Sequence, residues 1–164
     1  MPGVNAKEPR DVNFYGLPNV APAKYLIISR PPLPLPPILE GLMIQLQPLV
    51  EHFQKLTSSK PPPINAVLVN RYCNGQDSMG MHADNYYGMG SVPFIASISF
   101  GGARTFNLQS RNGQFSIACE LKSGSVLFMY GRKLQVEWKH GVFKCNSSLE
   151  ERWNLSFRNH IVLT

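Results

Sequence analysis

The sequence predicts a mainly β fold, a double-sheet jelly roll or barrel, with one flanking helix. From residue 65 onward, hydrophobic and polar residues alternate with the period of two that is typical of strands. Turn signals that contain glycine, such as Asn74-Gly75 and Asn112-Gly113, divide this stretch into about eight segments of strand length. Many short strands separated by regular turns are characteristic of jelly rolls and barrels. Ahead of them, one stretch carries apolar residues at helical spacing.

Residues 1–37 are expected to form an N-terminal arm ahead of the core. Prolines at positions 2, 9, 18 and 22 and little periodicity predict an extended, loop-like segment. The apolar, β-branched run from Tyr25 to Ser29 predicts a short strand within the arm. Five of the seven residues from 31 to 37 are prolines, which predicts a stiff, polyproline-like spacer. The alternative for this tract is a docking ligand for an SH3-type domain.

The predicted core, residues 38–164, begins with an amphipathic helix over Ile38–Leu56. One face of this helix is apolar and is expected to cover a sheet. The apolar residues of that face are Leu39, Leu42, Met43, Leu46, Leu49, Val50 and Phe53. Pro48 should kink or split the helix, because proline lacks the amide hydrogen and its ring clashes with the preceding turn. Thr57–Pro63 is polar and rich in proline, which predicts a loop.

The rest of the core is predicted to consist of strands that belong to one domain. The predicted strands are Asn65–Tyr72, Ser78–His82, Phe94–Phe100, Arg104–Leu108, Gln114–Cys119, Ser125–Tyr130, Val136–His140 and Arg152–Arg158. No internal repeat and no second domain are visible in the pattern, so we expect one domain overall.

Composition restricts the class of protein. The 164 residues suit one domain with a real core, and no apolar run approaches the ~20 residues of a membrane helix. Three cysteines without CxxC spacing indicate free thiols in a reducing compartment. We therefore expect an intracellular monomer, nuclear or cytoplasmic, that is neither secreted nor bound to a membrane. The net charge of +6 favours an anionic partner such as nucleic acid, although many basic proteins have none.

Three candidate metal ligands follow or end predicted strands. His82 and Asp84 are two residues apart, so on a strand their side chains would point the same way. His140 ends another predicted strand and is the third candidate. Two histidines and one carboxylate form the facial triad of non-haem Fe(II) oxygenases. A catalytic zinc site can use the same ligands. As structural alternatives, His140 would cap a strand and Asp84 would close a turn.

The last predicted strand, Arg152–Arg158, has one charged and one apolar face. Arg152, Asn154 and Arg158 are separated by even numbers of residues, whereas Leu155 and Phe157 face the other way. Two guanidinium groups turned into a barrel would be costly unless anions were paired with them. A dicarboxylate co-substrate supplies two anions, and arginine is suited to bidentate carboxylate binding. This pattern argues against simple zinc hydrolysis.

Several spaced motifs together resemble a known family. They are, in chain order, Asn70-Arg71-Tyr72, His82-x-Asp84, Pro93 to Gly101, Arg104-Thr105-Phe106, His140-Gly141 and Arg152-x-Asn154-Leu155-x-Phe157-Arg158. Over residues 64–160, this order resembles the nucleic-acid-repair branch of the AlkB family of Fe(II)/2-oxoglutarate-dependent dioxygenases. The earlier Pro9-Arg10 and Tyr15-Gly16 are similar to the segment ahead of the core in that branch.

The resemblance implies a double-stranded β-helix, which is a jelly roll, with Fe(II) on His82, Asp84 and His140. It also implies 2-oxoglutarate and O2 as co-substrates. The residues implied in 2-oxoglutarate binding are Arg152, Asn70 and Tyr72 at the distal carboxylate, and Arg158 and Asn154 near the carboxylate at the metal.

The activity that the resemblance implies is oxidative demethylation of N-alkylated bases in nucleic acid, which releases formaldehyde, succinate and CO2. A base inside a duplex must be flipped out or presented in a single strand. Two alternatives are an AlkB-like hydroxylase that acts on a protein or a small molecule, and a binding module that kept the fold without catalysis. The complete set of candidate ligands and arginines argues against the binding module.

Candidate substrate contacts lie in two places. The resemblance implies a nucleotide-recognition lid within residues 8–30, where Tyr15 or Tyr25 would stack on a base or else pack in the core. Five basic residues are candidates for phosphate contacts, with a solvated surface charge as the alternative for each: Arg10, Arg30, Arg71, Arg104 and Lys139. After Asp84, the repair branch usually carries acidic residues, but this chain has Asn85 and Tyr86. This departure weakens the expectation of an alkylated, positively charged base, and we expect single-stranded DNA or RNA as the partner.

Overall fold

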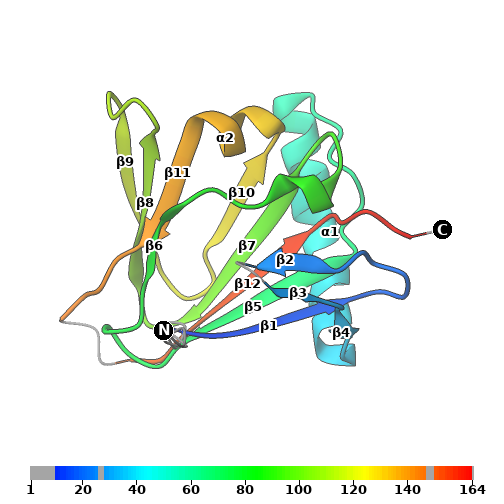
Figure 1. The fold of residues 1–164 in the computed structure, drawn as a ribbon, viewed down its shortest axis with the longest axis horizontal. Coiled ribbons are helices and arrows are strands. Elements are labelled where there is room, and N and C mark those ends of the chain that lie inside the picture. The colour runs from blue at the N-terminus through cyan, green and yellow to red at the C-terminus, as the bar shows by residue number, and fades with distance from the viewer. Residues whose placement is uncertain (1–9, 26–27, 147–149, 164) are drawn as a thin grey trace, which may run out of the picture.

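In the computed structural model, which describes residues 10–25, 28–146 and 150–163, two β-sheets face each other across a cavity (Figure 1). The mainly β prediction and the flanking helix are confirmed. No helix in the described ranges is long and apolar enough to cross a membrane.

The larger sheet has six strands in the order β10-β7-β12-β5-β1-β4. Its strands are β1 (Asp11–Gly16), β4 (Leu33–Pro34), β5 (Ala66–Tyr72), β7 (Phe94–Gly101), β10 (Val126–Tyr130) and β12 (Arg152–Arg158). All neighbours are antiparallel except β1 and β4. The central strand β12 pairs along its whole length with both β5 and β7. This pairing on both sides fixes which face of the sheet each β12 side chain points to.

The smaller sheet has four strands in the order β6-β11-β8-β9. Its strands are β6 (Met79–His82), β8 (Arg104–Ser110), β9 (Ser116–Leu121) and β11 (Trp138–Val142). A separate hairpin pairs β2 (Ala23–Tyr25) with β3 (Ile28–Arg30). A 3-10 helix, η1 (Tyr86–Met89), connects β6 to β7, and a short helix, α2 (Arg132–Glu137), connects β10 to β11.

Helix α1 (Pro37–Thr57) covers the outer face of the larger sheet. Its buried residues, among them Leu46 and Val50, pack against Phe157 and other residues of that face. The strand alternation predicted for β12 follows from this packing, because Leu155 and Phe157 face α1. Pro48 lies inside the helix but does not split it, so that alternative of the prediction is wrong.

Residues 11–16 correct the prediction of a loop-like arm. They form β1, which pairs antiparallel with β5 over six residues. Val12 and Phe14 alternate toward the inner face, but the pairing partner lies more than fifty positions away, so local propensity alone did not reveal the strand. The larger sheet therefore includes residues of the predicted N-terminal arm. The prediction of a single strand at Tyr25–Ser29 is wrong, because Tyr25 ends β2 whereas Ile28 and Ser29 belong to β3, which pairs antiparallel with it.

The segment before His140 is the other correction. The prediction of a strand over Val136–His140 is wrong at its start, because Arg132–Glu137 forms α2 and the strand begins at Trp138. Alternating residues in this short segment are compatible with either structure, and a six-residue helix carries too little periodicity to be recognised.

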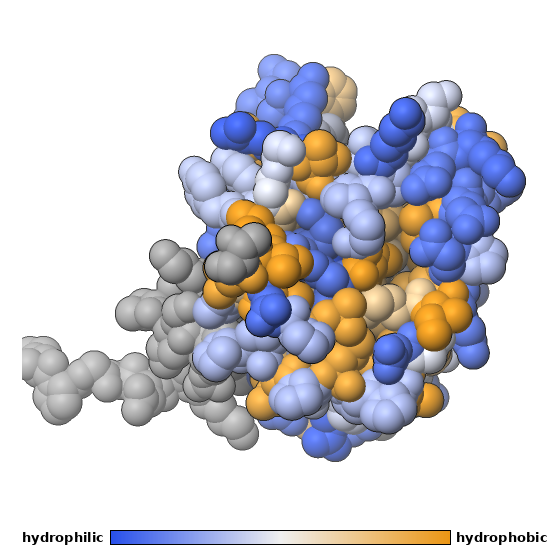
Figure 2. All heavy atoms as spheres, turned by 90° about the vertical axis from the view of Figure 1, so that its right-hand side faces the viewer, coloured by the Kyte–Doolittle hydropathy of each residue, from blue (hydrophilic) through white to orange (hydrophobic). Residues whose placement is uncertain are grey.

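The surface mixes polar and apolar side chains. On the face drawn in Figure 2, hydrophilic side chains predominate on the two upper lobes, and hydrophobic ones gather between and below them. Exposed apolar residues are ordinary in a folded domain of this size.

Candidate metal centre and its cavity

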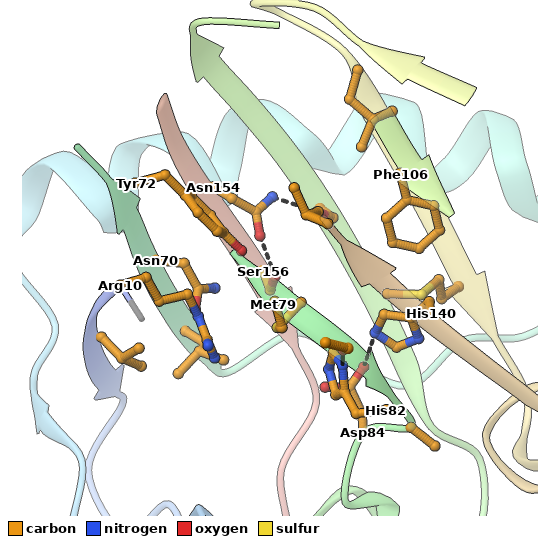
Figure 3. A pocket seen from close by; sticks show the side chains of 18 of the residues that line it. Arg10, Asn70, Tyr72, Met79, His82, Asp84, Phe106, His140, Asn154 and Ser156 are labelled. Carbon is orange, nitrogen blue, oxygen red and sulfur yellow. Dashed lines mark hydrogen bonds and ion pairs between the residues drawn. The ribbon is translucent and has the colours of Figure 1, made fainter. Parts of the chain in front are cut away.

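The structure brings the three predicted metal ligands together through strand pairing. His82 ends β6 and is the direct register partner of His140 on β11, and their rings are 4.4 Å apart. Asp84 follows β6 by two residues. One ligand atom from each of the three residues lies within 4.8 Å of the others, and all three point to one place (Figure 3).

Close approach of the two backbones makes this pairing possible. Gly141, directly after His140, lies so near to β6 that an added Cβ would come within 2.8 Å of the Met79 carbonyl oxygen. Any side chain at this position would push β6 away and carry His82 with it. The His140-Gly141 pair in the sequence thus has a geometric reason.

A hydrogen bond orients the His82 ring, and the Asp84 carboxylate and the Phe106 ring position that of His140. His82 Nδ1 lies 2.9 Å from the Gly80 carbonyl oxygen, so Nδ1 is the donor and Nε2 is the nitrogen left to bind a metal ion. His140 Nε2 lies 3.4 Å from Asp84 Oδ2, and the His140 ring stacks on Phe106. Burial lowers the pKa of His140 to about 4, which leaves the ring neutral at pH 7. A neutral imidazole is the form that binds a metal ion.

Asp84 is held as a carboxylate. Burial by itself would raise its pKa, but the charges of Arg158 and then of the nearby histidines outweigh burial and lower it. The Arg158 guanidinium lies 3.5 Å from Asp84 Oδ1. The Asp84 amide donates a hydrogen bond to Gln135 Oε1 at 2.9 Å, and Gln135 is buried in α2. Sequence reasoning missed Gln135, because nothing in its local pattern distinguishes it from a surface glutamine.

The far end of the cavity contains a buried guanidinium with spare donors. Arg152 is 2% exposed, donates to Ser99 Oγ at 3.0 Å and lies over the Tyr72 ring. Its Nε and Nη1 have no hydrogen-bond partner among the described residues. Burial lowers the pKa of Arg152 below its usual value. A buried guanidinium with free donors fits an anion, and a carboxylate accepts two of its hydrogen bonds at once.

Asn70 and Arg10 complete this end. Arg10 Nε donates to Asn70 Oδ1 at 2.8 Å, so the Asn70 amide oxygen is already used and its NH2 group remains to donate. Both residues line the cavity (Figure 3). Arg10 was predicted to contact substrate, but the structure places it against a residue predicted for co-substrate binding. Tyr72 is 1% exposed and closes the cavity behind them.

Asn154 lies between the two ends. Its Nδ2 donates to Ser97 Oγ and to the Ile98 carbonyl oxygen, and its Oδ1 accepts from Ser156 Oγ. Since both amide hydrogens are bound within the protein, Asn154 braces the cavity wall. Its predicted place near the carboxylate of 2-oxoglutarate at the metal end stays a prediction.

The cavity that connects the two ends has a volume of about 490 Å³. Its walls between the two ends are mostly apolar, and the apolar residues come from both sheets: Val12, Leu68, Phe106, Leu121, Met129 and Val142. Ser97, Asn154 and Ser156 add polar groups that are bonded to one another. A polar group at each end and an apolar middle suit a small ligand with two charged termini. The cavity thus fits a dicarboxylate that reaches from the metal site to Arg152.

Several predicted substrate contacts are corrected. Tyr15 packs against the core cluster under α1, on the face of the sheet away from the cavity, so it cannot stack on a base there. Arg71 pairs with Glu151 and Asp11. Arg104 is 3% exposed and donates to three backbone carbonyl oxygens, so it does not contact phosphate.

The other predicted contacts have mixed outcomes. Tyr25 and Arg30 lie in the β2–β3 hairpin, and their side chains are outside the described part of the chain. Lys139 is half-buried on β11, and by strand alternation it faces away from the His140 side. Asn85 lines the cavity mouth and caps η1 by accepting from the Tyr87 amide at 3.2 Å. Tyr86 begins η1 beside it.

Comparison with known proteins adds to this geometry. The profile of the 2OG-Fe(II) oxygenase superfamily matches residues 30–158. The chain is 32% identical to human alpha-ketoglutarate-dependent dioxygenase alkB homolog 3 over 94% of its own length and 53% of that protein. It is 30% identical to human DNA oxidative demethylase ALKBH2 over 81% of its length and 49% of that protein. The chain thus spans about half the length of these curated relatives.

A solved structure of OsALKBH1 superposes with a TM-score of 0.57 at 22% identity and covers 80% of this chain and 67% of that one. This likeness supports the jelly-roll fold.

Proposed function

Because the chain belongs to the 2OG-Fe(II) oxygenase superfamily and, within it, to the AlkB family, we propose that it demethylates N-alkylated bases in single-stranded DNA or RNA. The products would be formaldehyde, succinate and CO2. The observation that carries the proposal is a cavity with a His-Asp-His cluster at one end and a buried arginine with free donors at the other.

The roles of the residues follow from their geometry. His82, Asp84 and His140 would bind Fe(II), and Arg152 with Asn70 and Tyr72 would bind the distal carboxylate of 2-oxoglutarate. Arg158 lies at the metal end, where it keeps Asp84 charged. When bound, Fe(II) with 2-oxoglutarate and O2 supplies the oxidising power that hydroxylates the N-methyl carbon, and the product then loses formaldehyde.

The protein's own contribution is alignment and exclusion of water. The two ends of the cavity would fix the orientation of a dicarboxylate, because one end offers the three metal-binding side chains and the other offers two Arg152 donors that have no partner among the described residues. The apolar middle excludes water from the reacting atoms. The neutral His140 and the ionised Asp84 are already in the protonation states that metal binding requires.

The substrate class rests on further support. Two relatives carry names that specify demethylation or an AlkB homologue, and the net charge of +6 suits a polyanion. We place the protein inside the cell as part of this proposal, where its three free thiols would stay reduced. The β2–β3 hairpin, which lies outside both main sheets, is the proposed nucleotide-recognition lid.

The test is formaldehyde release from single-stranded oligonucleotides that carry 1-methyladenine, 3-methylcytosine or N6-methyladenine. DNA and RNA versions are assayed in parallel with Fe(II), 2-oxoglutarate and ascorbate. Release from any of them supports the proposal and ranks the substrates. If none reacts while 2-oxoglutarate still binds, the nucleic-acid assignment is wrong and a protein or small-molecule substrate replaces it.

A further inference from the structure

Two tyrosines lie stacked directly after Asp84 and Asn85, which line the cavity. The ring centres of Tyr86 and Tyr87 are 4.7 Å apart with an angle of 25° between their planes. Tyr86 is half-buried, but Tyr87 is 75% exposed. An aromatic ring this open, supported from below by a second ring, presents a flat apolar surface to solvent.

The segment that carries the rings is anchored. Asn85 caps η1, and Met89 at the other end of η1 is 1% exposed in the core between the sheets. The Gly88 carbonyl oxygen accepts a hydrogen bond from the Ile161 amide at 2.8 Å. Gly88 also lies so close to the His160 ring that an added Cβ would be 3.2 Å from it. The stacked pair is therefore a fixed feature of the cavity rim.

Positive charge lies beside the pair. The Arg132 guanidinium is 5.2 Å from the centre of the Tyr86 ring, and Arg111 is close enough for its charge to act on the Tyr86 phenol. The Arg111 amide donates to the Glu137 carbonyl oxygen, which joins the β8–β9 turn to the end of α2. Neither arginine forms a salt bridge within the described part of the chain. Both charges are exposed and available.

The rings, these charges and the metal site belong to one connected unit. Helix α2 contributes Arg132 to the rim and Gln135 to the Asp84 amide. Tyr86 follows Asp84 by two residues, which span at most about 7 Å of chain. The stacked rings are therefore within reach of the nucleotide next to a base that enters the cavity.

We propose that Tyr86, Tyr87 and Arg132 form a platform that binds the nucleotide adjacent to the base being demethylated. This inference rests on the proposed function and specifies its substrate as a strand, not a free base. The adjacent base stacks on the open ring of Tyr87, and Arg132 and Arg111 contact phosphates. Stacking on aromatic rings tolerates any base, and phosphate contacts position a strand without reading its sequence. The platform thus favours single strands irrespective of their sequence.

Binding of unmodified oligonucleotides tests the platform directly. Fluorescence anisotropy with labelled single-stranded DNA and RNA 12-mers measures the affinity of the full chain. Tyr87→Ala should weaken binding about tenfold, within the range of base–aromatic stacking, whereas Tyr87→Trp should retain it. Arg132→Gln should reduce the slope of log affinity against log salt by about 0.7, the value for one phosphate contact on a single strand.

The matched control is Phe143→Ala. Phe143 is another exposed aromatic residue, 50% exposed, and it follows the end of β11 opposite to α2 (Figure 1). Its loss should leave oligonucleotide binding unchanged. Equal weakening by Phe143→Ala and Tyr87→Ala would indicate general stickiness, and the platform would be wrong. Wild-type affinity in Tyr87→Ala would also overturn it.

A second measurement tests whether Tyr87 contacts the nucleic acid or only supports the position of Asp84, as a structural brace. The substrate is the alkylated base that ranks first in the formaldehyde assay. Tyr87→Ala should lower about tenfold the ratio of kcat/KM for an oligonucleotide that carries this base to kcat/KM for the corresponding free nucleoside. A brace would lower both values in proportion and leave the ratio unchanged, which would contradict the platform. If the unsubstituted protein demethylates the oligonucleotide and the free nucleoside with equal kcat/KM, the platform is wrong and the proposed function stays intact. No demethylation of any of the three bases, in an oligonucleotide or as the free nucleoside, would contradict the proposed function itself.

Discussion

The two ends of the cavity differ in how their charges are compensated. At the metal end, the Asp84 carboxylate is flanked by Arg158 and His140, and the Asp84 amide is bound by Gln135. At the other end, two donor atoms of the buried Arg152 have no partner among the described residues. The metal end is thus arranged before any ligand arrives, whereas the Arg152 end is complete only with an anion. Charge compensation at the metal end comes from the protein itself, whereas at the Arg152 end it requires a bound ligand.

The largest effect is expected from the loss of a ligand at the metal end. His82→Ala should abolish formaldehyde release, by about a thousandfold or more, because a three-ligand site loses one ligand. Bound iron, measured by elemental analysis after gel filtration, should fall in parallel. His52→Ala is the matched control, since His52 lies on the exposed side of α1. Activity that survives in His82→Ala would disprove the iron assignment.

Acid should lower the free energy of unfolding of the metal-free protein, because two buried histidines become protonated. Burial lowers the pKa of both His140 and His160 to about 4. The unfolded chain, whose histidines titrate near 6.5, therefore binds more protons than the folded chain between pH 6.5 and 4. The stability from the two neutral rings is complete above pH 6.5 and is lost as the pH falls to 4, by about 3 kcal/mol per histidine. Urea unfolding over this range measures the loss.

His160→Leu is the control for this pH dependence. The His160 ring nitrogens have no partner in the described chain, so leucine removes a titrating group without breaking a hydrogen bond of the ring. The free energy of unfolding of this variant should fall about half as steeply between pH 6.5 and 4. A profile parallel to that of the wild type would show that other groups cause the acid effect.

Arg152→Met should weaken the binding of 2-oxoglutarate at the other end of the cavity. We expect the KM for 2-oxoglutarate to rise about a hundredfold, because a buried ionic contact to a carboxylate is lost. The ligand-free protein should be no less stable, since the unsatisfied buried charge is removed as well. The rise in Tm caused by Mn(II) with 2-oxoglutarate should disappear.

The matched control for Arg152→Met is Arg71→Met. Arg71 lies on the neighbouring strand but is paired with Glu151 at the surface. Its KM for 2-oxoglutarate should stay at the wild-type value. Full 2-oxoglutarate affinity in Arg152→Met would mean that the free donors of this end do not bind the co-substrate.

Gln135→Leu should produce the smallest effect, a loss of metal affinity that leaves the Arg152 end of the cavity unchanged. It removes the acceptor for the Asp84 amide, and residues that orient metal ligands typically contribute about tenfold to metal affinity. Competition with a metal chelator measures this affinity, and the KM for 2-oxoglutarate should change much less. Gln135→Glu, which keeps an acceptor oxygen, should restore most of the affinity. An equal loss in both variants would point to the packing of α2.

Much of the site could be predicted because its residues occur in short, spaced patterns. The separation by two of His82 and Asp84, and the even spacing of Arg152 and Arg158, follow from strand geometry that holds in any sheet. The roles of Gln135 and Arg10 could not be predicted in this way. Each acts through a hydrogen bond to a residue at least fifty positions away, and local sequence contains no information on such contacts.

The sequence by itself determined the mainly β class, the helix over one face, the two faces of the last strand and the candidate ligands. These features depend on the periodicity of nearby residues, which local geometry dictates. Only the tertiary structure decided that residues 11–16 complete the large sheet, that Tyr15 faces α1 and that Arg104 is buried. These outcomes depend on pairing and packing between distant segments, where the same residue type can face solvent, core or cavity.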